Sequence, residues 1–194
     1  MANTREKTLM LAAMGLLTAI VVVLQAVASV IKFGMFSIAL VFIPIVVGAA
    51  LYGWKAGTWL GFVFSVVVMF TDTALFMAIS PVGTVITVML KGTLAGFCAA
   101  VTYKALENKN SWLAIILAAT VCQVVNKVIF LLGCGIFFYP TVQGWAESAG
   151  FGNTILYLIF GMTGLNSLVE LAVNLCLSTA IVRILSIVTR KKAA

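Results

Sequence analysis

The chain has 194 residues, of which 63% are hydrophobic and only 9% are charged. Soluble domains carry about 25% charged residues, so this composition excludes a soluble globular domain and indicates an all-α integral membrane protein. The formal net charge of +7 does not indicate a nucleic-acid partner. Most lysines and arginines lie in short segments between apolar runs, which is a signal of membrane topology.

Six apolar segments are long enough, or nearly so, to cross a bilayer core of about 30 Å, which takes about 20 helical residues. They predict a single six-helix membrane domain over residues 1–194, with spans at 8–31, 37–52, 56–70, 83–105, 112–138 and 161–187. The first is longer than the apolar core of a signal peptide, so we expect it to be retained. The second and third are short, which leaves open a tight hairpin or a tilted or re-entrant segment.

The distribution of basic residues predicts that both termini are cytoplasmic. Such a topology puts nine of the 12 lysines and arginines on the inner side and Lys32 alone on the outer side, as the positive-inside rule requires. The inner residues are Arg5, Lys7, Lys55, Lys104, Lys109, Arg183, Arg190, Lys191 and Lys192. The same topology puts the longest connections outside, at 71–82 and 139–152, with Asp72 and Glu147 in them.

Small residues follow one face of the first predicted helix. Ala12, Gly15 and Ala19 share this face, and small residues let helix backbones approach closely in lipid. The face fits packing within this chain or docking onto another membrane protein.

Three ionisable residues, Lys91, Lys127 and Glu170, lie deep inside apolar segments. A charge inside a membrane costs at least about 2.5–3.5 kcal/mol, so such residues usually face a partner, a cavity or a substrate. Polar residues accompany them at helical spacing: Gln123 and Asn126 beside Lys127, Asn166 beside Glu170, and Thr84 and Thr87 before Lys91. The predicted topology places these groups in the outer half of the membrane.

Two interpretations of this cluster are open. Glu170 can pair with Lys91 or Lys127 while the amides join helices, or the cluster can line a cavity for a small solute. Two lysines against one glutamate leave an excess positive charge, so we hypothesise a ligand with a carboxylate. Trp145, in the second outer connection, could cap a small ligand.

Several chemistries have no support in the sequence. The chain has no histidine, no phosphate-binding loop of the GxxxxGK[ST] type and no Ser/His pair, so we predict no enzyme activity, no cofactor and no metal site. The four cysteines lie singly in apolar segments, where small hydrophobic packing is the usual role and a disulfide or metal site the alternative. A membrane protein of this kind is a binding protein, a stand-alone facilitator or one subunit of a larger machine.

The stretch from Phe42 to Gly57, FIPIVVGAALYGWKAG, followed by Gly61, resembles substrate-binding S components of energy-coupling factor (ECF) transporters. Further matches are KGTLAG at 91–96 and VNL at 173–175, and residues 15–19 stand at the place of that family's Ala-xxx-Ala motif. Length, number of spans and terminal positions also match, so the resemblance covers nearly the whole chain.

The resemblance implies a prokaryotic plasma-membrane protein that captures a water-soluble vitamin from outside. It implies partners as well: a membrane T component, which Ala12, Gly15 and Ala19 would dock, and two cytosolic ATPases that drive import. Lys91, Gln123, Asn126, Lys127, Asn166, Glu170, Thr84, Thr87 and Trp145 are the expected substrate-binding residues.

The sequence favours some vitamins over others as the substrate. Riboflavin-binding members have an Asn followed three residues later by Lys, whereas here Asn166 is followed by Val169 and Glu170. The excess lysine favours an acidic vitamin, and pantothenate is favoured among these because its hydroxyl and amide groups suit Asn, Gln and Glu. Riboflavin or another vitamin precursor, and a facilitator without ATPases, are the alternatives.

Overall fold

The computed structural model describes residues 4–30, 32–33, 36–37, 40–164, 167, 169–170 and 172–173. In this part of the chain, long helices α1 (Thr4–Val30), α3 (Trp54–Thr71), α5 (Pro81–Leu106) and α6 (Ser111–Phe137) run side by side. Each contains an apolar stretch long enough to cross a membrane. The prediction of a helical membrane architecture is therefore confirmed for four spans of the described residues.

The predicted span at 37–52 is wrong in length. Only α2 (Phe42–Tyr52) is helical there, with 11 residues, and at 1.5 Å per residue it covers about 16 Å. Before it, β1 (Lys32–Phe33) and β2 (Phe36–Ser37) form a short antiparallel pair. Gly53 ends α2 with a φ of 78°, a conformation that only glycine adopts freely. The tight hairpin that the sequence left open is thus formed by a short α2 and α3.

The two connections expected outside contain short helices. These are α4 (Ala74–Ile79) and α7 (Tyr139–Ser148), followed by α8 (Thr154–Leu156) and the π-helix η1 (Tyr157–Met162). Ser80 caps α5 by accepting a hydrogen bond from the Gly83 N–H, and Pro81 starts the helix. Most of the predicted span at 161–187 lies outside the described residues.

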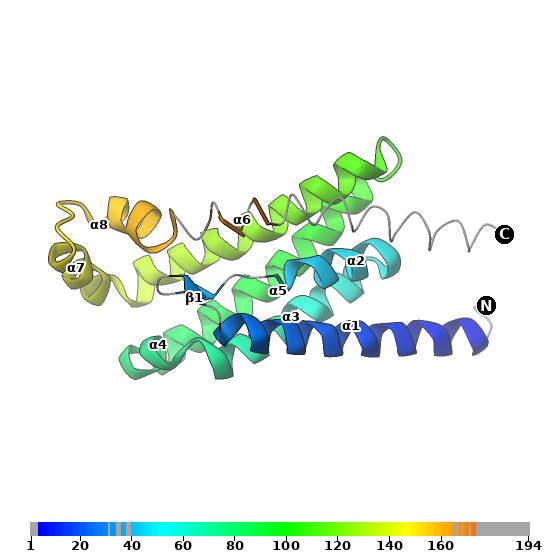
Figure 1. Ribbon diagram of the computed structural model, residues 1–194, viewed down its shortest axis with the longest axis horizontal. Coiled ribbons are helices and arrows are strands. Elements are labelled where there is room, and N and C mark those ends of the chain that lie inside the picture. The colour runs from blue at the N-terminus through cyan, green and yellow to red at the C-terminus, as the bar shows by residue number, and fades with distance from the viewer. Residues whose placement is uncertain are drawn as a thin grey trace.

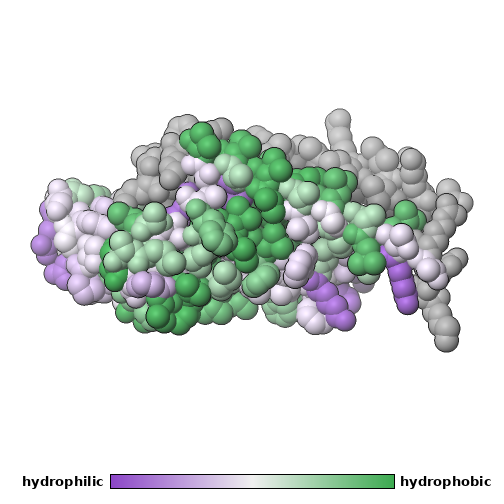
Figure 2. Space-filling view, turned by 90° about the horizontal axis from the view of Figure 1, so that it is seen from below, coloured by the Kyte–Doolittle hydropathy of each residue, from purple (hydrophilic) through white to green (hydrophobic). Residues whose placement is uncertain are grey.

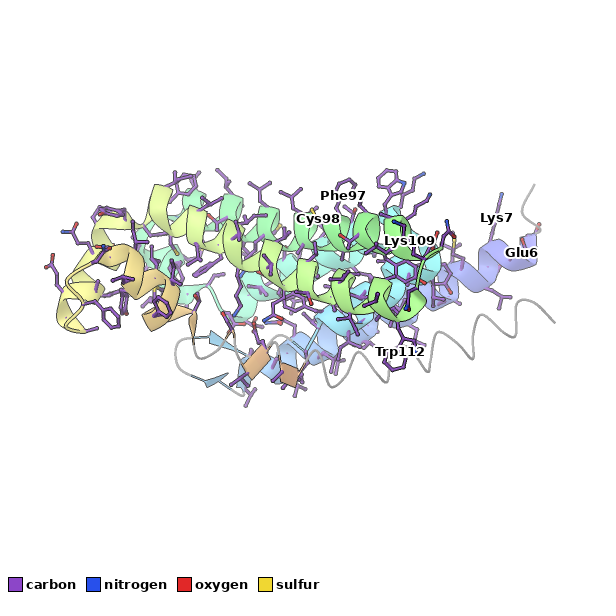
Figure 3. All side chains as sticks on the ribbon, turned by 90° about the horizontal axis from the view of Figure 1, so that it is seen from above. Glu6, Lys7, Phe97, Cys98, Lys109 and Trp112 are labelled. Carbon is purple, nitrogen blue, oxygen red and sulfur yellow. The ribbon has the colours of Figure 1, made fainter. Side chains whose placement is uncertain are left out.

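The connections gather at two opposite ends (Figure 1). The start of α1, the α2–α3 turn and the α5–α6 connection share one end, and α4, α7 and α8 share the other. Figure 3 shows Lys7 and Lys109 at the first end, which also holds Lys55 and Lys104. Figure 2 shows apolar side chains over the middle of one face and hydrophilic ones towards its ends. This is the charge asymmetry that the topology prediction used.

Helices α3 and α5 touch through glycines. A Cβ added to Gly61 would overlap the carbonyl oxygen of Gly92, and one added to Gly96 would overlap that of Gly57. Such contact brings two backbones as close as they can come in lipid. Because Lys91 comes directly before Gly92, this contact sets the position of Lys91 along α3.

We predict that Gly61→Ala and Gly96→Ala each lower stability by about 1–3 kcal/mol, because the added methyl meets backbone that cannot move without separating the helices. The thermal unfolding midpoint in detergent measures this. Gly135→Ala, in α6, is the matched control because nothing lies within 4 Å of its added Cβ. Equal midpoints for all three variants would contradict the close contact.

Candidate functional site

The membrane-embedded charges form two sites rather than one. Lys127 lies in α6, and its Nζ is 2.8 Å from Oε2 of Glu170. Lys91 lies in α5, with its Nζ 5.4 Å from the centre of the Phe130 ring, in cation–π contact. The sequence left open whether Glu170 pairs with Lys91 or with Lys127, and in the structure it pairs with Lys127.

The Lys127–Glu170 pair is held by further hydrogen bonds between α6 and the segment at 167–170. Lys127 Nζ donates to Ser167 Oγ at 2.7 Å, and Gln123 Nε2 donates to the Ser167 carbonyl oxygen at 3.2 Å and to Glu170 Oε2 at 3.5 Å. The Glu170 side chain is 4% exposed and that of Lys127 20%. A nearly buried carboxylate is thereby satisfied by two donors, as burial requires.

A groove of about 570 Å³ lies beside this pair. Gln123, Lys127, Thr163 and Ser167 contribute polar groups to its wall, and the rest is mainly apolar, including Leu131 and Phe160. This volume falls within the range of about 300–1,000 Å³ that small-molecule sites occupy, and a mostly apolar wall with a few polar groups is typical of them.

The turn that leads into the groove is π-helical. Thr163 Oγ1 donates to the carbonyl oxygens of Leu158, at 3.1 Å, and Ile159, at 3.0 Å. After the π-turn, the Ser167 N–H donates to the Thr163 carbonyl oxygen at 2.8 Å. Single π-turns inside helices occur frequently at functional sites.

Lys91 lines a second, smaller cavity of about 30 Å³ together with Asp72, Thr84 and Thr87. Asp72 also accepts a hydrogen bond from Gln25 Nε2 of α1, at 2.8 Å, so α1 reaches this cavity. Thr87 Oγ1 and Gln25 Oε1 are buried without a hydrogen-bond partner among the described residues. This volume is about that of one water molecule in the liquid, so the cavity is too small for a vitamin.

The excess of positive charge inferred from the sequence is not supported. The count left out Asp72, which was assigned to an outer connection, but Asp72 caps the end of α3 and lines the Lys91 cavity. Two carboxylates therefore accompany the two lysines among the described residues. The error came from treating the end of an apolar segment as solvent-exposed.

The predicted substrate-binding residues divide between these sites. Gln123 and Lys127 line the groove and Glu170 bonds to both, whereas Lys91, Thr84 and Thr87 line the small cavity. Asn126 is buried in α6 without lining either. Trp145 packs edge-on against Phe76, with ring centres 6.1 Å apart, and does not line the groove. Asn166 lies outside the described residues.

Sequence reasoning missed Ser167 and Thr163 in the groove and Asp72 and Gln25 at the small cavity. Ser167 stands three residues before Glu170, so helical spacing could have found it. Thr163 stands four residues before Ser167 and seven before Glu170, so the same spacing could have found it, since the π-turn at Tyr157–Met162 lies before Thr163.

The model of the family described as ECF transporter, substrate-specific component, matches residues 9–182. The chain belongs to this family. It is therefore an S component, which is a transport protein rather than an enzyme. Family membership implies a vitamin substrate, and it implies a membrane T component and ATPases as partners. S components are integral membrane proteins, in accord with the helices described above.

One curated relative is the pantothenic acid transporter PanT of Lactococcus lactis subsp. cremoris (strain MG1363). It is 28% identical over 158 residues, which cover 74% of this S component and 74% of PanT. No solved structure gives a significant match.

We predict that Lys127→Met lowers the stability of the ligand-free S component by about 3–5 kcal/mol, because it leaves the Glu170 carboxylate buried without its charge partner. The double variant Lys127→Met/Glu170→Gln should regain most of the loss, since the uncompensated charge is gone. Thermal unfolding in detergent compares the two. Lys109→Met, at an exposed lysine, is the control, and a double variant no more stable than the single one would contradict the pairing.

Proposed function

We propose that this S component captures pantothenate, or a closely related carboxylate vitamin, in the groove beside Lys127 and passes it to an ECF import complex. The observation that carries the proposal is the Lys127 ammonium in the wall of a groove of suitable volume. The relationship to PanT supports the same substrate class.

The chemistry of Lys127 fits a carboxylate ligand. Its contacts with Glu170 and Ser167 use two of three ammonium donors, counting only described residues. A ligand carboxylate can take the third. Glu170 also holds the ammonium in place, with its Oε2 2.8 Å from Lys127 Nζ. No excess charge is needed, because the ligand shares a lysine that is already oriented.

We expect the unaltered S component in detergent to bind pantothenate, and Lys127→Met/Glu170→Gln to lose at least about 90% of the affinity, since a charge-assisted hydrogen bond is worth about 1.5–3 kcal/mol. Isothermal titration measures both. Riboflavin is the comparison ligand. Tight binding of riboflavin without measurable binding of pantothenate would overturn the proposed substrate.

The exposed face of α1 is proposed as the docking surface for the T component, with the lysine-rich end in the cytoplasm and the groove reached from the outer end. Within the apolar stretch of α1 only 11% of residues are buried, against 39–44% in the other three spans. Ala12, Gly15 and Ala19 are exposed, and nothing lies within 4 Å of a Cβ added to Gly15. This supports docking rather than packing within the chain.

We predict that Gly15→Leu abolishes uptake in cells that also express the partner subunits, because the larger side chain holds the helices apart, while pantothenate binding in detergent is unchanged. Leu16→Ala, at a neighbouring exposed position, is the control variant. Normal uptake by Gly15→Leu would show that the T component docks elsewhere.

A further inference from the structure

The hydroxyl groups of the two threonines in the groove, Thr120 and Thr163, both donate to backbone carbonyl oxygens. Thr120 Oγ1 donates to the Ile116 carbonyl oxygen at 2.9 Å, and Thr163 Oγ1 donates to the carbonyl oxygens of Leu158 and Ile159. A carbonyl oxygen cannot donate, so each hydroxyl proton is committed to its own helix. Towards the groove, both threonines can therefore only accept a hydrogen bond.

Ser167 has the opposite character. Its Oγ accepts from Lys127 Nζ at 2.7 Å, and its own proton has no acceptor among the hydrogen bonds found between described residues. Ser167 and Lys127 thus present two adjacent donors, an arrangement that matches the two oxygens of one carboxylate.

The acceptor of Thr163 lies about one helical turn from this donor pair. The Ser167 N–H donates to the carbonyl oxygen of Thr163, four residues earlier, at 2.8 Å, which is the hydrogen bond of an α-helical turn. Four residues at 1.5 Å correspond to about 6 Å along the axis. Thr120 stands seven residues before Lys127 on α6, or about 10 Å away, so Thr163 is the nearer acceptor.

We infer that Thr163 is a specificity-determining residue, whose Oγ accepts a hydrogen bond from a hydroxyl or amide N–H that lies about 6 Å from the ligand carboxylate. The inference rests on the proposed function and extends it from an acidic vitamin to one that carries such a donor. Pantothenate has an amide N–H and hydroxyls beyond its carboxylate. Thr163 is 7% exposed, so a ligand without the donor leaves a buried acceptor unsatisfied, which sites penalise strongly.

The test is a comparison of two ligands on matched variants. We would titrate pantothenate, and an analogue with both hydroxyls replaced by hydrogen and the amide nitrogen methylated, into the unaltered chain, Thr163→Val, Thr163→Ser and Thr120→Val. Valine keeps the shape of threonine without the acceptor. We expect Thr163→Val to bind pantothenate about tenfold more weakly and to bind the analogue as the unaltered chain does. Thr163→Ser should retain full affinity for pantothenate, and Thr120→Val should keep the same ratio of pantothenate affinity to analogue affinity as the unaltered chain.

The titrations distinguish a failure of this inference from a failure of the proposed function. If Thr163→Val weakens both ligands by the same factor, Thr163 acts only on the π-turn and the inference is overturned. A ligand-dependent loss in Thr120→Val instead of Thr163→Val overturns it as well. If the unaltered chain binds no pantothenate, the proposed function fails and the inference with it.

Discussion

The ion pair between Lys127 and Glu170 connects the residue after the π-turn that carries the buried carboxylate to α6. Gln123 of α6 donates to the Ser167 carbonyl oxygen and to Glu170 Oε2, and Lys127 donates to Ser167 Oγ, so these contacts surround the pair. The groove lies between α6 on one side and Ile159, Phe160, Thr163, Gly164 and Ser167 on the other. A buried pair of this kind is weak evidence for stability, since apolar residues of similar size often replace one at no loss. Its presence is better explained by the need to hold an ammonium group in a groove wall.

The second charged site stabilises a different part of the molecule. Asp72 receives a hydrogen bond from Gln25 of α1 and lies in the cavity of Lys91. It therefore joins α1 to the end of α3 and to the middle of α5. Among the four described spans, α1 has the smallest buried share, and this polar contact adds to its packing against α3.

Much of the fold could be predicted from the sequence, because long apolar segments dictate helices in a membrane. Lys127 and Glu170 could be found for a related reason: the cost of a membrane-embedded charge makes such residues conspicuous. The length of α2 could not be predicted, since the apolar segment at 37–52 continues past Phe42 without a break and gives no sign of where the helix begins. The split into two sites was also beyond the sequence. It depends on which faces of α5 and α6 meet, and the π-turn at 157–162 shifts the residues that follow.

The glycine contact between α3 and α5 has a consequence for how such a protein can change its ligand over evolutionary time. None of Gly57, Gly61, Gly92 and Gly96 lines the groove, so we expect substitutions at Thr163 or Ser167 to leave the packing of α3 against α5 unaltered. Lys91, in contrast, adjoins Gly92 in the sequence, so we expect a change there to act on the glycine contact between α3 and α5. We therefore expect new substrate preferences to arise through the groove, while the Lys91 cavity and the glycine contact are inherited together as a scaffold.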